Sequence, residues 1–556
     1  MSPTKVKCTQ LLLVWCYVIS AFTIPSINTE VFTALAEMEE LLETESVLIQ
    51  NLEGFIKVEQ DKLNYLKNKI IEYQREHVDA SADITSYVAN PINAYLLTKR
   101  LTTDWRQMEN LMSHDVGSEF LNNITNLRNV LKFPSDEDLN GAAVALMRLQ
   151  DTYQLDTASV ARGELNGIQY STEMSSDDCF ELGRQSYVNY DYYHTVLWMK
   201  EAMTRLLEEP RNQTQTISKA DILEYLAFST YQEGNIEGAL TMTNELLELS
   251  PEHERANGNK VFYEKELAKI KADKKVKGDD DSEDTPISDL PVAKADPGVL
   301  DYSERRTYEM LCRGELTPTP AELRPLRCRY VSNNVPFLKI APLKLEEANM
   351  DPYIVIYHEV MYDSEIELVK KMALPRFRRA TVQNAVTGQL EVANYRISKS
   401  SWLKTEEHPK IGDIVQRTSD MTGLDMRSAE ELQVVNYGIG GHYEPHFDFA
   451  RREEASAFVG LGTGNRIATV LFYMSDVEQG GATVFTTIRR ALFPKKGSAA
   501  FWWNLHRSGD GDFRTRHAAC PVLTGSKWVS NKWIHEAHQE FRRPCLLEPD
   551  NAEFAI

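Results

Sequence analysis

The run Tyr443-Glu-Pro-His446-Phe-Asp448-Phe decides how the C-terminal part of this 556-residue chain is interpreted. On an extended strand, residues two positions apart project from the same face, so His446 and Asp448 can hold one metal ion together. A His-x-Asp pair is common by chance, and a metal site therefore needs a further ligand and an independent signal. The run by itself predicts a β-strand that carries part of a metal site.

Short strand-like runs surround this stretch and are separated by Gly pairs and by Asp or Pro turns. They cover residues 432–437, 467–474, 482–485 and 499–503. Their regular spacing favours a sandwich or jelly roll over a parallel α/β sheet. We therefore expect residues 346–556 to form a double-stranded β-helix within a multidomain α+β protein.

A third metal ligand is expected downstream, where His517 lies in a strand-like segment and Lys527 follows ten residues later. Two histidines and one carboxylate leave open metal positions, as in non-haem Fe(II) oxygenases. A dicarboxylate that chelates the iron at one end needs a fixed cation at the other, and Lys527 can supply it. His535 is the rival ligand, but no basic residue follows it at the same spacing. We expect His535 to act behind the ligands or on the cosubstrate.

A zinc hydrolase could use the same three ligands. That alternative leaves Lys527 and the open metal positions without a role. A second alternative is an inactive oxygenase fold that serves as a binding scaffold, which the presence of all four residues disfavours.

Upstream of the β-rich part, residues 273–345 are interpreted as a linker, because an Asp- and Glu-rich run and scattered prolines bury little surface. Residues 166–272 have the spacing of tetratricopeptide hairpins, with Gly183 and Ala239 at helix crossings and Pro251 at an exit turn. This region is rich in tyrosine, and rings on a concave helical surface suit an extended proline-rich peptide. The candidate peptide-binding residues are Tyr190, Tyr192, Tyr193, Tyr225 and Tyr231.

Residues 24–165 are predicted to be helical. Apolar residues from Val31 to Ile70 recur at alternating steps of four and three, interrupted by Glu45 and Glu59. This heptad pattern favours a coiled coil used in assembly. The alternative is an amphipathic helix that packs on its own domain.

Residues 1–23 have the pattern of a cleaved secretory signal, since two lysines precede a short apolar run. The alternative is an uncleaved anchor, and no other stretch is apolar enough to span a membrane. In an oxidising lumen the cysteines nearest in sequence predict two disulfides, Cys312 with Cys328 and Cys520 with Cys545, with Cys179 left over. Asn123 and Asn212 begin glycosylation sequons, consistent with the same compartment.

The composition is that of a soluble globular protein, with 42% hydrophobic and 26% charged residues. The formal net charge of −21 argues against nucleic-acid binding, because phosphates would repel the chain.

Several motifs resemble those of collagen prolyl 4-hydroxylase α subunits, and the resemblance extends over nearly the whole chain. They include Val435-Asn-Tyr-Gly-Ile-Gly-Gly-His-Tyr-Glu-Pro-His-Phe-Asp-Phe, Arg466-Ile-Ala-Thr-Val-Leu-Phe-Tyr, Gly480-Gly-Ala-Thr-Val-Phe, Arg516-His-Ala-Ala-Cys-Pro-Val-Leu and Gly525-Ser-Lys-Trp-Val-Ser-Asn-Lys-Trp-Ile-His. The resemblance implies a procollagen-proline 4-dioxygenase that converts 2-oxoglutarate and O2 to succinate and CO2, with ascorbate as reductant.

The resemblance also implies roles for single residues. Iron would be held by His446, Asp448 and His517, and the distal carboxylate of 2-oxoglutarate by Lys527. Tyr437 would add a hydrogen bond to the cosubstrate, and His535 would assist its binding and decarboxylation. Trp533 and Arg466 would border the peptide groove.

Partners and location follow from the same resemblance. It implies an α2β2 tetramer with protein disulfide isomerase as the β subunit, in the lumen of the endoplasmic reticulum. The chain ends in Asn-Ala-Glu-Phe-Ala-Ile, which is not a retention signal, so we expect a partner to provide retention. A lysyl hydroxylase remains an alternative within the enzyme class, and the tyrosine-rich region favours proline.

Overall fold

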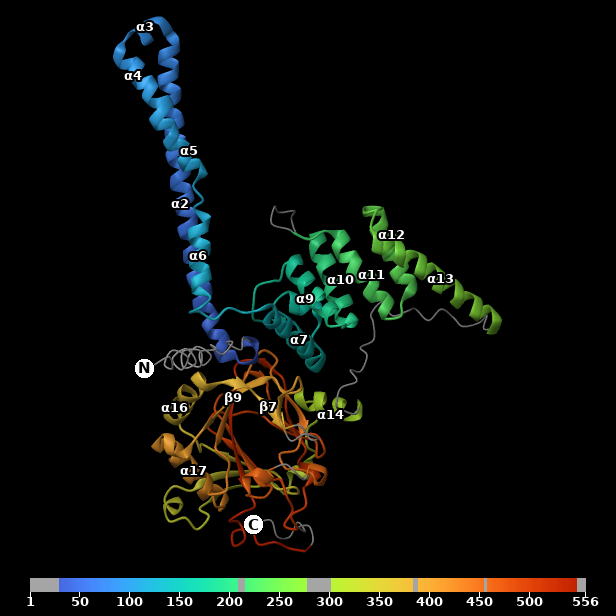
Figure 1. Cartoon of the computed structure of the whole chain (residues 1–556). Coiled ribbons are helices and arrows are strands. Elements are labelled where there is room, and N and C mark those ends of the chain that lie inside the picture. The colour runs from blue at the N-terminus through green and yellow to red at the C-terminus, as the bar shows by residue number, and fades with distance from the viewer. Residues whose placement is uncertain (1–29, 209–215, 278–301, 384–388, 455–457, 548–556) are drawn as a thin grey trace, which may run out of the picture. The chain divides into compact units, whose positions relative to one another are not determined.

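The computed structural model describes residues 30–208, 216–277, 302–383, 389–454 and 458–547 (Figure 1). The predicted signal at residues 1–23, the sequon at Asn212 and the acidic run of the linker lie outside them. The chain divides into two compact units, of which one contains residues 37–135 and the other contains residues 30–36 and 136–556. None of the described helices has the length and apolar character needed to cross a bilayer.

The first unit is a long helix with shorter helices running back along it (Figure 1). The elements are α2 (Leu35–Ala82), α3 (Ile84–Ala89), α4 (Pro91–Lys99), α5 (Trp105–Ser113) and α6 (Gly117–Leu127). The ring of Phe55 on α2 lies 5.7 Å from that of Phe120 on α6. Gly54 leaves room for Phe120, because a Cβ there would lie 3.1 Å from its ring. The predicted helical region is therefore present.

Most of the predicted heptad seam is not buried within the described chain. Val31, at its start, is buried. Six of its later residues are about half exposed or more, namely Leu42, Ile49, Leu52, Ile56, Leu63 and Ile70. The returning helices contact α2 through other residues, such as Asn51 and Phe55. The pattern thus predicted the long helix correctly, whereas the coiled coil stays a prediction.

The second unit begins with a helical region. After α7 (Asp136–Tyr153), α8 (Thr157–Ala161), β1 (Glu164–Leu165) and β2 (Ile168–Gln169), five helices form successive hairpins. They are α9 (Ser176–Val188), α10 (Tyr192–Glu208), α11 (Lys219–Gln232), α12 (Ile236–Leu249) and α13 (Glu254–Lys277). Gly183 lets α9 approach α10, because a Cβ there would lie 2.9 Å from Met199. The predicted tetratricopeptide-like arrangement is confirmed.

The C-terminal part of this unit is a two-sheet antiparallel sandwich. The larger sheet has the order β3-β4-β5-β16-β12-β19-β10-β9-β6. Its strands are β3 (Cys328–Val331), β4 (Leu343–Asn349), β5 (Ile354–His358), β6 (Arg378–Arg379), β9 (Ser398–Leu403), β10 (Leu432–Tyr437), β12 (Arg466–Tyr473), β16 (Ala499–Trp503) and β19 (Trp528–His535).

The smaller sheet has the order β11-β17-β14-β15 and faces the larger one. Its strands are β11 (Tyr443–His446), β14 (Thr483–Phe485), β15 (Arg490–Leu492) and β17 (His517–Ala519). Tyr437 and Leu471 of the larger sheet share a hydrophobic cluster with Phe485 and Ala519 of the smaller one. Two pairs complete the strands, β7 (Thr381–Gln383) with β8 (Leu390–Val392) and β13 (Gln479–Gly480) with β18 (Val522–Thr524). The predicted jelly roll is confirmed.

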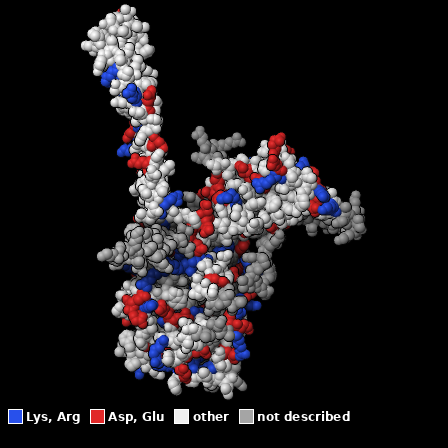
Figure 2. Space-filling view, viewed as in Figure 1, with Lys and Arg blue, Asp and Glu red and all other residues white. Residues whose placement is uncertain are grey.

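Helices α16 (Asp363–Ala373) and α17 (Pro409–Thr422) complete this core, since Ile366 and Ile414 are buried in its largest cluster. On the face seen in Figure 2, acidic and basic side chains are interspersed over most of the surface, while several basic side chains lie together near the middle of the view.

The predicted linker at residues 273–345 is wrong in its second half. Residues 302–345 contain α14 (Tyr302–Cys312), α15 (Pro320–Leu323), β3 and the start of β4. Tyr308 and Leu311 on α14 are buried against Val484 and Ala518 of the smaller sheet. The folded part of the sandwich therefore begins earlier than expected.

The predicted disulfides are also wrong in the structure. The bond joins Cys312 to Cys520, 208 positions apart. Cys312 ends α14 and Cys520 follows β17, and both are buried in one cluster, whereas Cys328 and Cys545 are exposed thiols. Proximity in sequence misled the prediction because the fold brings α14 onto β17. Cys179 is buried and takes no part in a disulfide, as expected.

Candidate active site

Three side chains meet between the two sheets. His446 on β11 and His517 on β17 are direct partners across the antiparallel pair, and Asp448 follows β11. One ligand atom from each lies within 4.8 Å of the others. The Asp448 carboxylate is 3.8 Å from His446 Nε2 and 3.6 Å from His517 Nε2. The three residues expected to bind iron are therefore brought together, and His517 rather than His535 completes the set.

The hydrogen bonds of the two histidines suit them for a metal. His446 Nδ1 lies 2.8 Å from the carbonyl oxygen of Glu444, and His517 Nδ1 lies 2.9 Å from that of Thr515. A carbonyl only accepts, so each Nδ1 carries the proton and each Nε2 presents its lone pair. Burial holds the pKa of His446 well below its usual value, so the ring is neutral, as a ligand must be.

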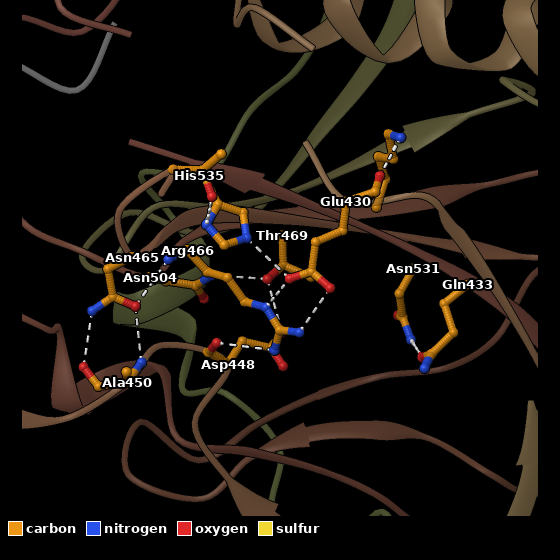
Figure 3. Close-up of polar contacts among 12 residues, drawn as sticks. Glu430, Gln433, Asp448, Ala450, Asn465, Arg466, Thr469, Asn504, Asn531 and His535 are labelled. Atoms are coloured by element: carbon orange, nitrogen blue, oxygen red, sulfur yellow. Dashed lines mark hydrogen bonds and ion pairs between the residues drawn. The ribbon is translucent and has the colours of Figure 1, made fainter. Parts of the chain in front are cut away.

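The carboxylate is oriented by a polar chain from the larger sheet (Figure 3). Thr469 Oγ1 donates to Asp448 Oδ2 at 2.8 Å, and Asn504 Nδ2 donates to Thr469 Oγ1 at 2.9 Å. Burial raises the pKa of Asp448, but His517 and the other groups around the carboxylate, among them Arg466, outweigh burial and hold the pKa at about 2. The group is thus an anion fixed in one orientation.

Lys527 shares the pocket with these ligands. It is only 2% exposed, and its ammonium lies 4.9 Å from the centre of the Tyr437 ring. No carboxylate among the described residues forms an ion pair with it, and burial lowers its pKa to about 7. A buried cation without a partner favours an anionic ligand.

Lys527 lies at the pocket, but the spacing argument that singled it out does not hold, and its role in binding the cosubstrate stays a prediction. The parity of its spacing from His517 assumed one continuous strand. In the structure His517 begins β17, Lys527 stands just before β19, and β18 lies between them. The two residues meet because the sandwich brings those strands together.

The rest of the pocket wall comes from both sheets. Tyr437, Leu471, Val529, Asn531 and Trp533 line it from the larger sheet, and Tyr443, Thr483 and Ala519 from the smaller one. Tyr437 and Trp533 are therefore placed at the pocket, as the resemblance implied. Burial raises the pKa of Tyr437 to about 12, so its hydroxyl stays a donor.

Arg466 is not among the residues that line the pocket. Its guanidinium is 4.0 Å from the centre of the Trp533 ring and pairs through two nitrogens with Glu430. It also donates to the carbonyl oxygen of Asp448 at 3.3 Å. Arg466 thus supports Trp533 and Asp448, and a direct contact with peptide stays a prediction.

His535 is fully buried and does not line the pocket. Its Nε2 is 3.0 Å from Glu430 Oε1, and its Nδ1 is 2.7 Å from the carbonyl oxygen of Gly464 (Figure 3). Its contact with the ligand set runs through Glu430 and Arg466. A role of His535 in cosubstrate binding and decarboxylation stays a prediction.

Several residues of the site gave no signal in the sequence. Arg396 lines the pocket, lies 4.7 Å from the centre of the Tyr443 ring and bonds to neutral acceptors at Thr381 and Gln433. Gln433 also accepts from Asn531, which lines the pocket (Figure 3). Single Arg and Asn residues are common, and only the fold places them here.

The helical region of this unit has a second pocket, on α9, α11, α12 and α13. It is lined by Tyr187, Tyr225, Phe228, Arg255 and Asn259, among others. The Tyr187 ring meets those of Tyr192, Tyr225 and Phe228 edge-on at 5.0–5.9 Å. We call this set of rings and pocket residues the aromatic groove.

The candidate tyrosines differ in their relation to the aromatic groove. Tyr225 and Tyr192 belong to it, and Tyr231 continues the ring contacts towards Tyr263. Tyr193 packs on His194 instead. Tyr190 is 79% exposed and makes none of these ring contacts.

Known protein families match three successive regions of the chain. Residues 34–167 match the prolyl 4-hydroxylase alpha-subunit N-terminal region, and residues 176–269 match the prolyl 4-hydroxylase peptide-substrate-binding domain. Residues 432–535, which contain the ligand set, match the 2OG-Fe(II) oxygenase superfamily.

Curated relatives are similar over almost their whole length. Prolyl 4-hydroxylase subunit alpha-1 of Mus musculus is 48% identical over 542 residues, covering 96% of this chain and 99% of the relative. Subunit alpha-2 of Caenorhabditis elegans is 48% identical over 529 residues, covering 95% of each. With its ligand set, its helical modules and this similarity, the chain belongs to the prolyl 4-hydroxylase α-subunit family.

Proposed function

We propose that this chain hydroxylates C4 of prolines in collagen-like repeats, using Fe(II), 2-oxoglutarate and O2. One observation carries the proposal. His446, Asp448 and His517 present their ligand atoms to the same pocket in which Lys527, a buried cation, has no carboxylate partner among the described residues. A dianion that chelates a metal at one end meets both needs.

Each residue of the site has its own role in the proposed reaction. His446, Asp448 and His517 would hold the iron, which with its cosubstrate supplies the oxidation of a C–H bond. Lys527 and the Tyr437 hydroxyl would bind the distal carboxylate of 2-oxoglutarate. Thr469 keeps the Asp448 carboxylate in place, so the ligand set needs little rearrangement when metal binds. Trp533, supported by Arg466, would form a wall against the peptide.

The aromatic groove is proposed to hold a second stretch of the same substrate. A proline-rich chain is already extended, so it loses little entropy when it binds. The rings of Tyr187, Tyr225 and Phe228 offer stacking surfaces, and Arg255 and Asn259 offer polar contacts to a peptide backbone. Tethering at the groove would raise the concentration of further prolines near the active site.

The wider setting is proposed from the family. We propose an α2β2 tetramer with protein disulfide isomerase, in the lumen of the endoplasmic reticulum, with ascorbate as the reductant. Asn123 is exposed on α6, as a glycosylation site requires. Glycosylation at Asn123 and Asn212 is part of the proposal.

The test is peptide-dependent release of succinate by the assembled enzyme, with wild type compared with Lys527→Ala. We expect Lys527→Ala to raise the KM for 2-oxoglutarate by about a hundredfold or more, since the dianion loses its cation. The KM for peptide should stay unchanged. Lys344→Ala is a control, because Lys344 is exposed on β4 and pairs with Glu359. Succinate release that lysine-containing peptides stimulate and proline-containing peptides do not would contradict the proposal.

A further inference from the structure

A short segment from the start of the described chain packs on the catalytic sandwich. Within this segment, Glu30–Ala36, the side chains of Val31, Thr33 and Ala34 are at most 3% exposed. We call it the N-terminal clip. Ile439 N–H donates to the carbonyl oxygen of Phe32 at 3.0 Å, and Phe32 N–H donates to Asp138 Oδ1 at 3.2 Å. The clip is therefore bonded both to the sandwich and to α7.

The clip contacts the turn that separates two strands of the active site. Residues 438–442 connect β10, which ends at Tyr437, to β11, which carries His446. A Cβ at Gly438 would overlap the backbone of Phe32 and Thr33, and a Cβ at Gly440 would lie 2.9 Å from the carbonyl oxygen of Ala145 on α7. The glycines of this turn are thus required by what packs on it.

A buried amide links the clip to Lys527. The Asn436 side chain is fully buried and accepts from Ala36 N–H at 3.1 Å. Its Nδ2 donates to the carbonyl oxygen of Lys527 at 3.2 Å, and Tyr437 N–H donates to the same oxygen at 3.1 Å. One side chain therefore separates the clip from the backbone of Lys527.

A second connection runs through an ion pair. Glu30 Oε2 lies 2.9 Å from Arg379 Nε, and the Arg379 guanidinium donates to the carbonyl oxygens of Arg396 and Ser398. Arg396 lines the active-site pocket. The clip thus holds backbone on two sides of the pocket, at Lys527 and at Arg396.

We propose that the N-terminal clip is a positioning element of the cosubstrate site, through Asn436 to Lys527 and through Arg379 to Arg396. The reason is physical. Within the part of the chain that the structure describes, Lys527 has no acidic partner to hold its ammonium, so the place of its charge depends on its backbone. The proposal rests on the proposed binding of 2-oxoglutarate by Lys527. It implies that the catalytic part needs residues located 400 positions upstream of Asn436 to bind its cosubstrate fully.

The test uses the full chain in its assembled form and two variants. Asn436→Ala removes the link to Lys527 and should raise the KM for 2-oxoglutarate about tenfold, as loss of one hydrogen bond of ordinary strength does. Glu30→Gln weakens the ion pair with Arg379 and should raise the KM for 2-oxoglutarate about threefold. In both, kcat and the KM for peptide should stay within a factor of two. Gly412→Ala on α17 is the control, because a Cβ there meets nothing within 4 Å.

A binding measurement without turnover accompanies the kinetics. The rise in melting temperature produced by 2-oxoglutarate with Mn(II) should shrink in both variants and not in the control. A purely structural clip would lower the melting temperature without ligand and leave the 2-oxoglutarate constants at wild type, and that result overturns the inference. If Asn436→Ala does not fold, unchanged constants in Glu30→Gln overturn it. An unchanged KM in Lys527→Ala would instead overturn the proposed function.

Discussion

The active-site pocket and the aromatic groove are built in opposite ways. The pocket contains charged and polar side chains that are nearly all buried. Asp448 is hydrogen-bonded to Thr469, whereas Lys527 has no carboxylate partner among the described residues. The groove contains half-buried rings that contact one another edge-on, such as Tyr187, Tyr225 and Phe228. In the pocket a single lost group leaves a buried charge or an incomplete ligand set. In the groove the stacking energy is spread over several rings, so each substitution has a small effect.

The largest effect is expected in the pocket, from Asp448→Ala. Removing the anion between the two histidines should reduce succinate release by more than about a thousandfold, because the metal loses its carboxylate ligand. The stabilisation that Mn(II) gives in thermal unfolding should vanish as well. Asp413→Ala, at an exposed acid on α17, serves as the control. If Asp448→Ala retained turnover, a single substitution in the pocket would not have the large effect that distinguishes it from the aromatic groove.

A smaller effect is expected from pH, through Lys527. Its pKa is lowered from 10.5 to about 7 by burial, so the empty pocket loses the cation above about pH 7. The affinity for 2-oxoglutarate, followed by thermal shift with Mn(II), should therefore fall by up to about tenfold per pH unit above that value. Between about pH 7 and 10.5 the unfolded chain binds more protons than the folded one, so this residue's contribution to the free energy of unfolding rises with pH.

Lys527→Met is the matching variant, because it keeps the length of the side chain and removes the titrating group. In Lys527→Met, the pH dependence of the affinity for 2-oxoglutarate and the contribution of residue 527 to the pH dependence of the free energy of unfolding should both disappear. If wild type shows a flat affinity from pH 7 to 9, the cation is not the group that binds the carboxylate.

The smallest effect is expected in the aromatic groove, from Tyr225→Ala. Loss of one ring contact of about 0.5–1.5 kcal/mol should raise the KM for long proline-rich repeats by a factor of about two to ten. The KM for a short peptide, which cannot reach the groove and the pocket at once, should not change. Tyr190→Ala is the matched control, since Tyr190 is 79% exposed and lies outside the ring contacts. Equal changes for long and short peptides would make the groove part of the catalytic site.

Much of the site could be predicted because its chemistry is visible in short motifs. His446 and Asp448 are only two positions apart, so both side chains can reach one metal ion, although β11 ends at His446 and Asp448 lies just beyond the strand. Heptad spacing likewise predicted the long helix α2, and small residues at helix crossings predicted the hairpins of α9 to α13. These patterns depend on contacts within a few residues.

Other features depend on contacts between distant parts of the chain, and there the sequence misled or was silent. It suggested disulfides between cysteines that are close in sequence. In the structure α14 packs on β17, and the disulfide joins Cys312 to Cys520. It suggested a linker where β3 and β4 extend the larger sheet. It gave no sign that Arg396 faces the pocket or that the clip reaches Asn436.

The sequence by itself thus indicated the pair His446 and Asp448 and determined the helical modules, because residues two, three or four positions apart stay close together in any strand or helix. Only the tertiary structure decided which cysteines pair, which polar side chains orient Asp448, and what holds Lys527 in place. Those outcomes follow from the packing of strands and helices far apart in the chain, and that packing leaves no local pattern to read.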